Sequence, residues 1–445
     1  MTAVTFSSRK RSPSSLCLPG AKAPLGLPGA KAHLRLLAAL VGLSLLAGCA
    51  GLDLGGGAKP ATPGPVVQAP PAVIQPVQPT PMPGRDTSKF YTPKYMAGLE
   101  PVRVALLLPF SSPRADVRNV ANALYNAAQL SLFDFNNPNV LLIPKATNGS
   151  AASAAAAATT AINEGADIIL GPLFAEEVSG IAVPAGQAHI PVIAFSTDTS
   201  VGGGGVYLLS FAPFVDVNRI VDYATRQGLT SYGALYPAGS YGNRVSSLFR
   251  EAVAQHGGTI VASASYPATS EGMYEPAKQV AGSMASYKAI FLPEGGAALK
   301  QIAPMLSYFD VDTKAIKLIG TGQWDDPTLA HEPSLDGAWY PAPPPEGHLQ
   351  FAQRYRTAYG ATPPRIASLA YDAVSLTIAL SARPGDDRFS SATLTAPDGF
   401  SGVDGIFRFL PNGWTERGLA IMENRPGGAV VIDPAPVAFQ SAPVF

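Results

Sequence analysis

The sequence has little cysteine, little histidine and little charge for its 445 residues. Its only cysteines are Cys17 and Cys49, its histidines number five, and charged residues make up 14% of the chain. The histidines are scattered without metal-ligand spacing, and no serine stands in the G-x-S-x-G setting of a nucleophile elbow. These absences argue against a metalloenzyme, a thiol enzyme and a serine hydrolase. We therefore expect no catalytic residues, no cofactor and no metal site.

The charge balance argues against a nucleic-acid partner. The chain has 31 basic and 31 acidic residues, and six of the basic ones lie within the first 35 residues, where no acidic residue occurs. If residues 1–48 are removed, 25 basic residues remain against 31 acidic ones, a formal charge of −6. Binding to nucleic acid needs a basic surface, which this composition does not supply.

The basic start of the chain is followed by an export signal. Residues 36–47 are apolar except for Ser44, a run that is too short to span a bilayer. The four residues 46–49, "LAGC", resemble the bacterial lipobox, which implies cleavage before Cys49 and attachment to a membrane through acyl chains on its thiol. The alternative is that Cys49 is a buried small apolar residue. By resemblance to lipoprotein sorting in enteric bacteria, Ala50 implies the outer membrane, facing the periplasm.

A Pro/Gly-rich linker separates this cysteine from the folded region. Residues 49–100 include "PATPGPVVQAPPAVIQPVQPTPMPG", which has few charges and no helical period. Such a segment cannot bury a core and favours extended, polyproline-like conformations of about 3.1 Å per residue. We expect a disordered tether, which either sets the reach of the folded region or is passive.

Strands and helices alternate from residue 102 to about 197. "VRVALLLPF" is typical of a strand buried on both faces, and the apolar positions of 117–133 have helical spacing. "NVLLIPK" predicts a second strand, the alanine-rich "SAASAAAAATTAINEGA" predicts a helix, and "DIILGPL" and "IPVIAFS" predict further strands. This alternation indicates parallel strands joined by right-handed crossovers.

The same alternation restarts near residue 232. Strands are predicted in "YGALYPAGSYG", "TIVASASYP", "KAIFLPEGG" and "IKLIGTG", and helices in "RVSSLFREAVAQHGG", "EPAKQVAGSMASY", 297–309 and 347–359. Two successive halves of this kind predict an α/β protein with two Rossmann-like lobes, whose strand ends face one crevice.

The order of these motifs resembles the type 1 periplasmic binding protein fold of the Leu/Ile/Val-binding class. The matching stretches include "ADIILGPLFAEEV", "LYPAGSYGNRVSSLFREAVAQHGGTIV", "GHLQFAQRYRTAYGATPPRIASLAYDAVSL" and "SGVDGIFRFLPNGWTERGLAIMEN", and together they cover nearly all of 101–432. With the lipobox and the Pro-rich linker, the chain is similar to penicillin-binding protein activator lipoproteins, which are outer-membrane partners of peptidoglycan synthases.

The resemblance implies two lobes joined by three crossovers. We expect residues 101–213 and 339–396 to form the first lobe, and residues 214–338 and 397–432 to form the second. The proline-broken segment 433–445 is either a tail or a strap over the first lobe. The ligand crevice is expected at the carboxyl ends of the strands.

In amino-acid-binding members of the resembled family, two hydroxyl side chains hold the ligand carboxylate. One is a serine four residues after a glycine, and the other is a threonine at the end of the following strand. Here Ala175 stands four residues after Gly171, and Asp198 stands in place of the threonine. A carboxylate at 198 would repel a ligand carboxylate, so we expect altered ligand specificity or none.

The second lobe offers further cleft candidates by the same resemblance. Tyr241 matches a tyrosine that caps the cleft, and Glu294 follows a strand where it could pair with an amine; the alternatives are a turn tyrosine and a solvated carboxylate. Trp324 either stacks on a ligand or packs in the hinge. The candidate cleft residues are Phe110, Gly171, Pro172, Phe174, Ser196, Thr197, Asp198, Tyr241, Glu294, Gln323 and Trp324.

Two functions lead from the sequence, and a third, an enzyme acting on cell-wall material, has little support from the residues. The first is a non-enzymatic, lipid-anchored regulator of peptidoglycan synthesis that binds and activates a penicillin-binding protein. The second is the solute-binding lipoprotein of an ABC importer for amino acids or related small molecules. The altered carboxylate site favours the first, and the two-lobe pattern with Tyr241 and Glu294 favours the second.

Overall fold

The computed structural model describes residues 90–99, 101–267, 269–383 and 385–439. The predicted signal peptide 1–48, the predicted lipidation site Cys49 and most of the predicted linker 49–100 lie outside the described residues. In the part of the chain that is described, no helix combines the length and the apolar character that crossing a membrane requires.

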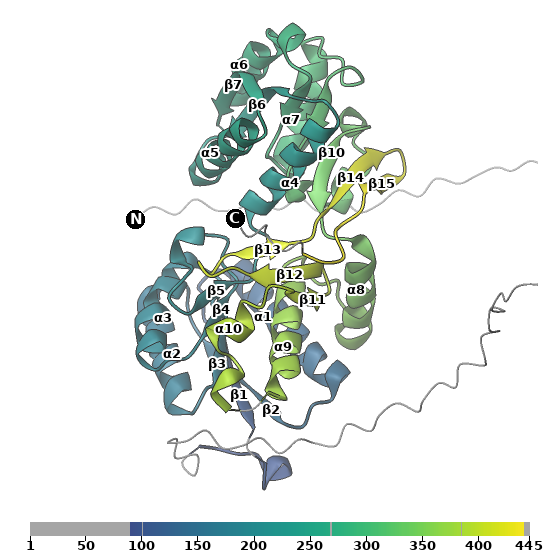
Figure 1. Ribbon diagram of the computed structural model, residues 1–445. Coiled ribbons are helices and arrows are strands. Elements are labelled where there is room, and N and C mark those ends of the chain that lie inside the picture. The colour runs from purple at the N-terminus through teal and green to yellow at the C-terminus, as the bar shows by residue number, and fades with distance from the viewer. Residues whose placement is uncertain (1–89, 100, 268, 384, 440–445) are drawn as a thin grey trace, which may run out of the picture. The chain divides into compact units, whose positions relative to one another are not determined.

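The first sheet consists of parallel strands in the order β2-β1-β3-β4-β5 (Figure 1). The strands are β1 (Val102–Leu108), β2 (Val140–Ala146), β3 (Ile168–Leu170), β4 (Val192–Ala194) and β5 (Val206–Leu208). The connecting helices are α1 (Ala115–Phe135), α2 (Ala151–Asn163), α3 (Ala175–Gln187) and the short 3₁₀-helix η3 (Thr199–Val201). The predicted parallel arrangement of this half is confirmed.

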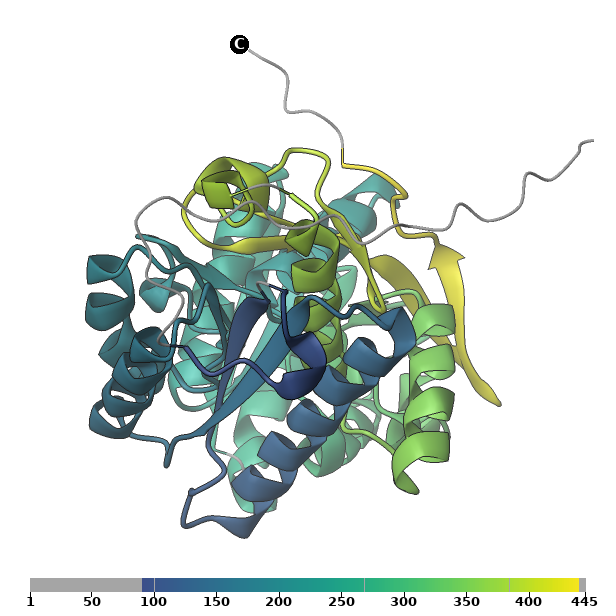
Figure 2. The ribbon, with the colours of Figure 1, turned by 90° about the horizontal axis from the view of Figure 1, so that it is seen from below.

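Helices cover both faces of this sheet, and β1 supplies side chains to both (Figures 1 and 2). Val104 and Leu106 pack with α1 and with α9 (Ala367–Ser381), whereas Leu107 packs with α2 and α3 on the other face. Successive side chains of a strand point to opposite faces. Burial on both faces explains why β1 is a continuous apolar run instead of an alternating one.

The second sheet has the order β15-β14-β10-β9-β8-β6-β7 and is parallel from β7 to β10. Its strands are β6 (Ser231–Pro237), β7 (Thr259–Tyr266), β8 (Ala289–Phe291), β9 (Lys317–Ile319), β10 (Trp339–Ala342), β14 (Ala420–Arg425) and β15 (Gly428–Asp433). Its helices are α4 (Pro213–Arg226), α5 (Ser240–Gln255), α6 (Ser270–Ala281), α7 (Gly296–Tyr308), η4 (Met284–Ser286), η5 (Gly322–Trp324), η6 (Pro327–Leu329) and η7 (Pro333–Leu335). At the other end of the sheet, β14 pairs antiparallel with β10, and β15 pairs antiparallel with β14.

A small antiparallel sheet, β11-β12-β13, packs on the first sheet. Its strands are β11 (Phe400–Gly402), β12 (Gly405–Phe409) and β13 (Thr415–Arg417). The remaining helices are η2 (Lys94–Met96), α8 (Pro345–Tyr359), η8 (Gly385–Asp387) and α10 (Ser391–Leu394). Phe407 and Phe409 are buried in the core formed by β1, α1 and α9, and the ring of Phe409 lies 5.3 Å from that of Tyr207 in β5.

These contacts move two of the three expected crossovers. The first lies between the end of β5 at Leu208 and the start of α4 at Pro213. The second follows β10, because Trp339–Ala342 pairs with β9 and β14 and belongs to the second sheet, not to the first lobe as expected. The third is at 418–419, not at 397, because β12 buries Phe407 and Phe409 in the first core and β13 pairs with β12. We define the first lobe as 101–212 and 344–417, and the second lobe as 213–342 and 419–433.

Both ends of the described chain pack on the first lobe. Before β1, the side chain of Met96 is buried, and the guanidinium of Arg103 lies 5.2 Å from the centre of the Phe90 ring. After β15, Phe439 lies 4.6 Å from the guanidinium of Arg408 in β12. The described part of the C-terminal segment therefore returns to the first lobe as a strap.

Candidate functional site

A cavity of about 340 Å³ is lined by residues from all three crossovers. We call it the crossover cavity. The first lobe contributes Thr197, Phe211, Ala212, Arg365 and Arg417. The second lobe contributes Pro213, Val215, Asp216, Tyr241, Gly322, Gln323, Asp325 and Leu419, and Pro343 lies between the lobes. A cavity of this size, lined by both lobes and by several charged groups, is suited to a small ligand.

Asp216 reaches the cavity from the start of α4. Pro213 is the first residue of this helix, a position where proline is favoured because its fixed φ suits a helix and no N–H is needed. Oδ2 of Asp216 accepts a hydrogen bond from the backbone N–H of Gly322, at 2.9 Å, and this is its only hydrogen bond within the described residues. Burial raises the pKa of Asp216 to about 7, and the charge of Asp325 adds to the rise.

Arg365 forms an ion pair between the lobes. It stands directly after Pro363 and Pro364 and before α9. Its Nε donates to Oδ2 of Asp325 in the second lobe, at 3.2 Å, and its Nη1 donates to Oδ1 of Asp404. Asp404 is fully buried and also accepts from Oγ of Ser368, at 2.6 Å. Both carboxylates are therefore held by hydrogen bonds to the first lobe's arginine.

A histidine completes this network. Nδ1 of His348 lies 2.6 Å from Nη1 of Arg365. Burial and the charge of Arg365 both lower the pKa of His348. A neutral imidazole can accept a hydrogen bond from the guanidinium through Nδ1, so the lowered pKa suits this arrangement.

Arg417, at the end of β13, is the most enclosed charge of the cavity. Its side chain lies against the rings of Phe211 and Phe407, at 4.9 and 5.5 Å from their centres, and Nε donates to the carbonyl of Ser210, at 3.0 Å. The residue is 5% exposed. Nη1 and Nη2 are buried and have no hydrogen-bond partner in the described part of the chain. Burial lowers the pKa of Arg417, while Asp404, Asp372 and Asp216 oppose this.

Three of the sequence-predicted cleft residues line the crossover cavity: Thr197, Tyr241 and Gln323. Tyr241 stands in the first turn of α5, and its hydroxyl lies 3.4 Å from Oγ1 of Thr321. Burial raises the pKa of Tyr241 to about 12, so the phenol stays protonated. The structure brings these residues, from the loop after β4, from α5 and from η5, to one cavity.

At the strand-end position where a ligand carboxylate was expected, the polar side chains form hydrogen bonds with neighbouring residues of the same turn. Asp198 accepts from N and Oγ of Ser200, at 3.0 and 2.7 Å, and thereby caps η3. These hydrogen bonds lower the pKa of Asp198. Ser196 is buried, and its Oγ accepts from the backbone N–H of Asp198. Ala175 is the first residue of α3 and has no hydroxyl to offer a ligand.

The remaining candidates of the first lobe pack within it. Gly171 has φ +83°, and a Cβ there would lie 2.2 Å from the carbonyl oxygen of Leu107, so only glycine fits between β3 and β1. Pro172 is buried, and Phe174 precedes α3. The ring of Phe110 makes an edge contact with a tyrosine of α1, at 5.8 Å, and packs on the first core. None of the four lines the crossover cavity.

Glu294 and Trp324 are tied to each other and to the second core. Trp324 is 1% exposed, and its Nε1 donates to the carbonyl of Glu294, at 2.9 Å. The carboxylate of Glu294 accepts from the hydroxyl of Tyr266, at 3.1 Å, and from the N–H of Gly295. Trp324, the last residue of η5, therefore packs in the core of the second lobe instead of facing a ligand.

Sequence reasoning did not find the charged residues of the crossover cavity. Arg365 and Arg417 lie in the quoted stretches "ATPPRIASLAYDA" and "GWTERGLA", and Asp216 follows the first crossover. A single arginine after a proline pair, or in a short strand, carries no signal of its own. A buried carboxylate, Glu177, was missed as well: it accepts from Oγ1 of Thr147 and the N–H of Gly149, and burial raises its pKa.

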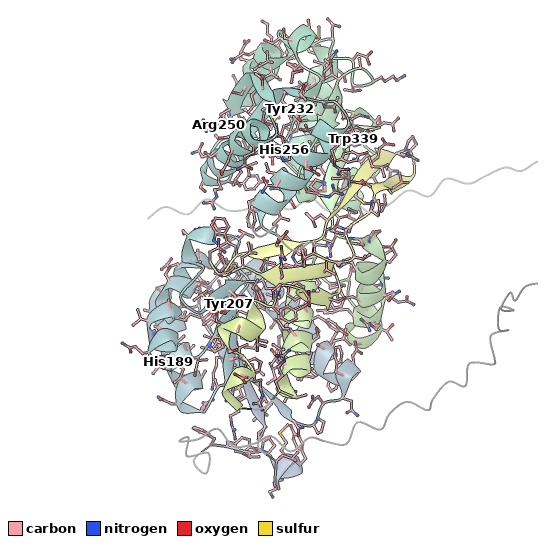
Figure 3. All side chains as sticks on the ribbon, in the orientation of Figure 1. His189, Tyr207, Tyr232, Arg250, His256 and Trp339 are labelled. Atoms are coloured by element: carbon pink, nitrogen blue, oxygen red, sulfur yellow. The ribbon has the colours of Figure 1, made fainter. Side chains whose placement is uncertain are left out.

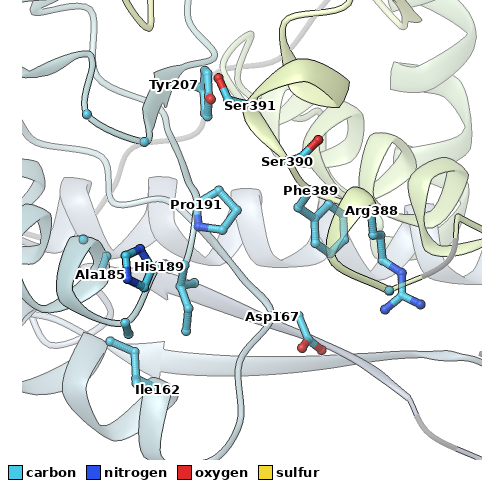
Figure 4. A pocket seen from close by; sticks show the side chains of 16 residues that line it. Ile162, Asp167, Ala185, His189, Pro191, Tyr207, Arg388, Phe389, Ser390 and Ser391 are labelled. Carbon is cyan, nitrogen blue, oxygen red and sulfur yellow. The ribbon is translucent and has the colours of Figure 1, made fainter. Parts of the chain in front are cut away.

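A larger cavity, of about 870 Å³, lies in the first lobe (Figure 4). Its lining includes Asp167, Pro191 and Gly205, which precede β3, β4 and β5, and Arg388 from the segment after α9. It is therefore at the amino edge of the sheet, whereas open α/β sheets bind ligands at the carboxyl edge. Nε of Arg388 donates to the carbonyl of Arg383, at 3.1 Å, and Oδ2 of Asp167 accepts from the N–H of Arg103, at 2.7 Å.

In the described residues, no group of three or more His, Cys, Asp or Glu side chains is arranged to hold a metal ion. His189 and His256 lie on different lobes (Figure 3). The charged residues of the crossover cavity are instead two arginines and two aspartates.

Comparison with known proteins identifies the fold and the family. A family model described as "Periplasmic binding protein" matches residues 101–429. No curated protein sequence matches. Similar solved structures include a protein described as a branched-chain amino acid ABC transporter from Rhodospirillum rubrum, with a TM-score of 0.65, 19% identity and coverage of 75% of this chain and 100% of that chain.

Two further structures carry ligands. A solute-binding protein of an ABC transporter from R. palustris, in complex with benzoate, has a TM-score of 0.54 and 18% identity, and the match covers 76% of this chain and 97% of that chain. The branched-chain amino acid substrate-binding protein LivJ from Streptococcus pneumoniae, in complex with isoleucine, has a TM-score of 0.54 and 19% identity, over 75% of this chain and 100% of that chain. The fold is that of type 1 periplasmic binding proteins, and the chain belongs to the periplasmic binding protein family.

Proposed function

We propose that the chain is the solute-binding component of an ABC importer, and that it holds a small organic molecule in the crossover cavity. The observation that carries this proposal is the cavity of about 340 Å³ lined by both lobes at the carboxyl side of their sheets. The ABC transporter proteins with the same fold, among them those with isoleucine and benzoate bound, support a binding function instead of a catalytic one.

We further propose that the protein works in the periplasm, attached to the outer membrane through acyl chains on Cys49. Residues 46–49 support lipidation, and the Pro-rich segment before residue 90 supports a tether. Because Phe90 and Met96 pack on the first lobe, the tether reaches the folded region on that lobe.

The test is to purify the full chain from its native envelope in mild detergent and to analyse the small molecules released on denaturation by mass spectrometry. We expect one compound to co-purify in near-equimolar amount and to rebind saturably to the emptied protein. Uptake of that compound should fall when the gene is deleted. If a total metabolite extract supplies no compound that binds, the importer proposal is wrong.

A second candidate is a regulator that binds and activates a penicillin-binding protein. The observation that favours it is that the strand-end position offers no free group to a ligand carboxylate: Ala175 has no hydroxyl, and Asp198 caps η3. Affinity purification of the full chain from a detergent extract of its own envelope separates the two candidates. Enrichment of a peptidoglycan synthase supports the regulator, whereas enrichment of importer subunits supports the solute-binding protein.

A further inference from the structure

The two arginines of the crossover cavity differ in how far their hydrogen bonds are satisfied. Arg365 donates to Asp325 and Asp404 and lies next to His348. Its charge is thus paired on two sides, and it has a structural task, since it joins the lobes. A ligand that bound to Arg365 would have to compete with these carboxylates.

Arg417 has no such partners. Only its Nε is bonded, to the carbonyl of Ser210, and Nη1 and Nη2 lack an acceptor within the described residues although the side chain is 5% exposed. A buried polar group without a hydrogen bond is costly, and a buried charged group is more so. The fold therefore keeps an unsatisfied guanidinium beside a cavity.

The neighbouring carboxylates do not supply the missing acceptors. Asp404 uses its oxygens for Arg365 and Ser368. Asp372 accepts from the N–H of Val403 through Oδ1, at 2.7 Å, and its Oδ2 forms no hydrogen bond to Arg417 or to any other described residue. Both lower the electrostatic cost of the buried cation, as does Asp216. What Arg417 lacks is acceptor atoms, not negative charge nearby.

The carboxylate of Asp216 is also incompletely hydrogen-bonded. Its Oδ2 accepts from Gly322, and its Oδ1 has no partner among the described residues. Asp216 and Arg417 line the same cavity and interact electrostatically. One incompletely bonded carboxyl group and one incompletely bonded guanidinium therefore line the same cavity.

We propose that Arg417 and Asp216 bind a small zwitterion in the crossover cavity. The ligand's carboxylate accepts from Nη1 and Nη2 of Arg417, and its ammonium group donates to Oδ1 of Asp216. A carboxylate has the two oxygens that the guanidinium fork requires. A ligand without net charge fits a lining that contains two arginines and two aspartates, and Phe211 and Tyr241 offer ring surface to its apolar part.

This inference rests on the proposed function and names the groups that carry it. It places the charged ends of the ligand on the crossovers, and not on the strand-end position near Asp198. Arg417 of β13 and Asp216 of α4, which would hold the ligand, are 201 residues apart in the chain.

The first test measures ligand chemistry on the full chain in detergent. The twenty protein amino acids are screened by thermal shift, and the best binder is compared by calorimetry with two analogues of the same side chain. For leucine these are 4-methylpentanoate, which lacks the ammonium group, and 3-methylbutylamine, which lacks the carboxylate. We expect saturable binding that weakens by roughly 30-fold or more when the carboxylate is removed. If no amino acid binds, or if the amine binds as well as the zwitterion, the proposal is wrong.

The second test changes the protein. Arg417→Lys keeps the buried charge but loses the fork, so we expect affinity to fall by roughly 10-fold or more with a melting temperature near that of the wild type. Arg408→Lys is the matched control, because Arg408 lies on the neighbouring strand and pairs with Glu416; its affinity should not change. Arg417→Met, which removes the cation, should abolish binding. A compound that binds equally to all three variants contradicts the role of Arg417 and leaves the importer proposal standing, whereas the absence of any bound solute contradicts both.

Discussion

The strand ends of the first sheet and the crossover cavity both contain polar side chains, but the cavity differs in that two of its charged residues, Arg417 and Asp216, are incompletely hydrogen-bonded. Asp198 bonds to Ser200 and caps η3, and Ser196 bonds to the same turn. In the cavity, Nη1 and Nη2 of Arg417 have no hydrogen-bond partner in the described part of the chain, and Asp216 makes one hydrogen bond there. Satisfied groups stabilise local structure, whereas groups left unsatisfied beside a cavity indicate where a ligand can supply the partner.

The comparison also separates two kinds of charge inside the cavity. Arg365 is fixed by Asp404 and Asp325, so its removal should harm the fold. Arg417 lacks such bonds, so its exchange for lysine should harm binding more than folding. The following predictions test these differences, beginning with the largest expected effect.

Arg365→Ala should lower the free energy of unfolding by about 3–5 kcal/mol, because it leaves the fully buried carboxylate of Asp404 without its cation. The measurement is urea unfolding followed by circular dichroism. Lys145→Ala is the control: Lys145 pairs with the partly exposed Glu164, and its loss should cost about 1 kcal/mol or less. Equal losses in both variants would contradict a structural task for Arg365.

Gly171→Ala should destabilise the chain by about 2 kcal/mol or more, since φ +83° is unfavourable for alanine and the new Cβ would meet the carbonyl oxygen of Leu107. Gly186→Ala is the matched control inside α3, where a Cβ would meet no atom within 4 Å. It should stabilise the chain by about 0.5–1 kcal/mol. The measurement is thermal unfolding of both variants. An unchanged melting temperature for Gly171→Ala would show that the chain after β3 is not tightly packed against Leu107.

Asp216→Asn should flatten the dependence of stability on pH. In the folded chain the pKa of Asp216 is about 7, above the ordinary value of 3.8, so the folded state binds this proton more tightly. The resulting stabilisation is fully present below about pH 4 and is lost as pH rises through 7. Relative to the wild type, the variant should gain roughly 4 kcal/mol between pH 4 and 8, because one pKa unit corresponds to about 1.4 kcal/mol. Unfolding curves across this range check it, and parallel pH profiles would contradict a raised pKa.

Ala175→Ser should have the smallest effect. If the ligand is held by Arg417 and Asp216, restoring a hydroxyl at the start of α3 should change affinity by less than about 3-fold, which is under 1 kcal/mol. Calorimetry with the solute found to bind the wild type measures this. A gain of roughly 10-fold or more would mean that the strand-end position still takes part in binding.

Much of the fold could be predicted from the sequence because its signals are local. The apolar run of β1, the alanine-rich α2 and the restart near residue 232 all appear within short windows, and they indicate parallel strands wherever they alternate. The positions of the last two crossovers could not be predicted in this way. The strands β12 and β13 are short, and nothing local shows that Phe407 and Phe409 pack on the first core.

The residues of the candidate site also divide into those that the sequence predicted and those that it left ambiguous. Thr197 and Gln323 were found because they follow strands whose ends were expected to face the cleft, and Tyr241 was found because the resemblance implied a tyrosine there. Trp324 was ambiguous, because an aromatic residue at a strand end can face a ligand or a core, and the packing around η5 decides for the core.

The sequence by itself determined the two alternating halves, the carboxyl-edge location of the cleft and the loss of the strand-end hydroxyl at Ala175, because each depends on the order or identity of residues along the chain. Only the tertiary structure decided which charges are paired. Arg417 forms its hydrogen bond to Ser210, and interacts electrostatically with Asp404 and Asp216, only when the three crossovers come together. That packing also leaves Nη1 and Nη2 without a hydrogen-bond partner among the described residues.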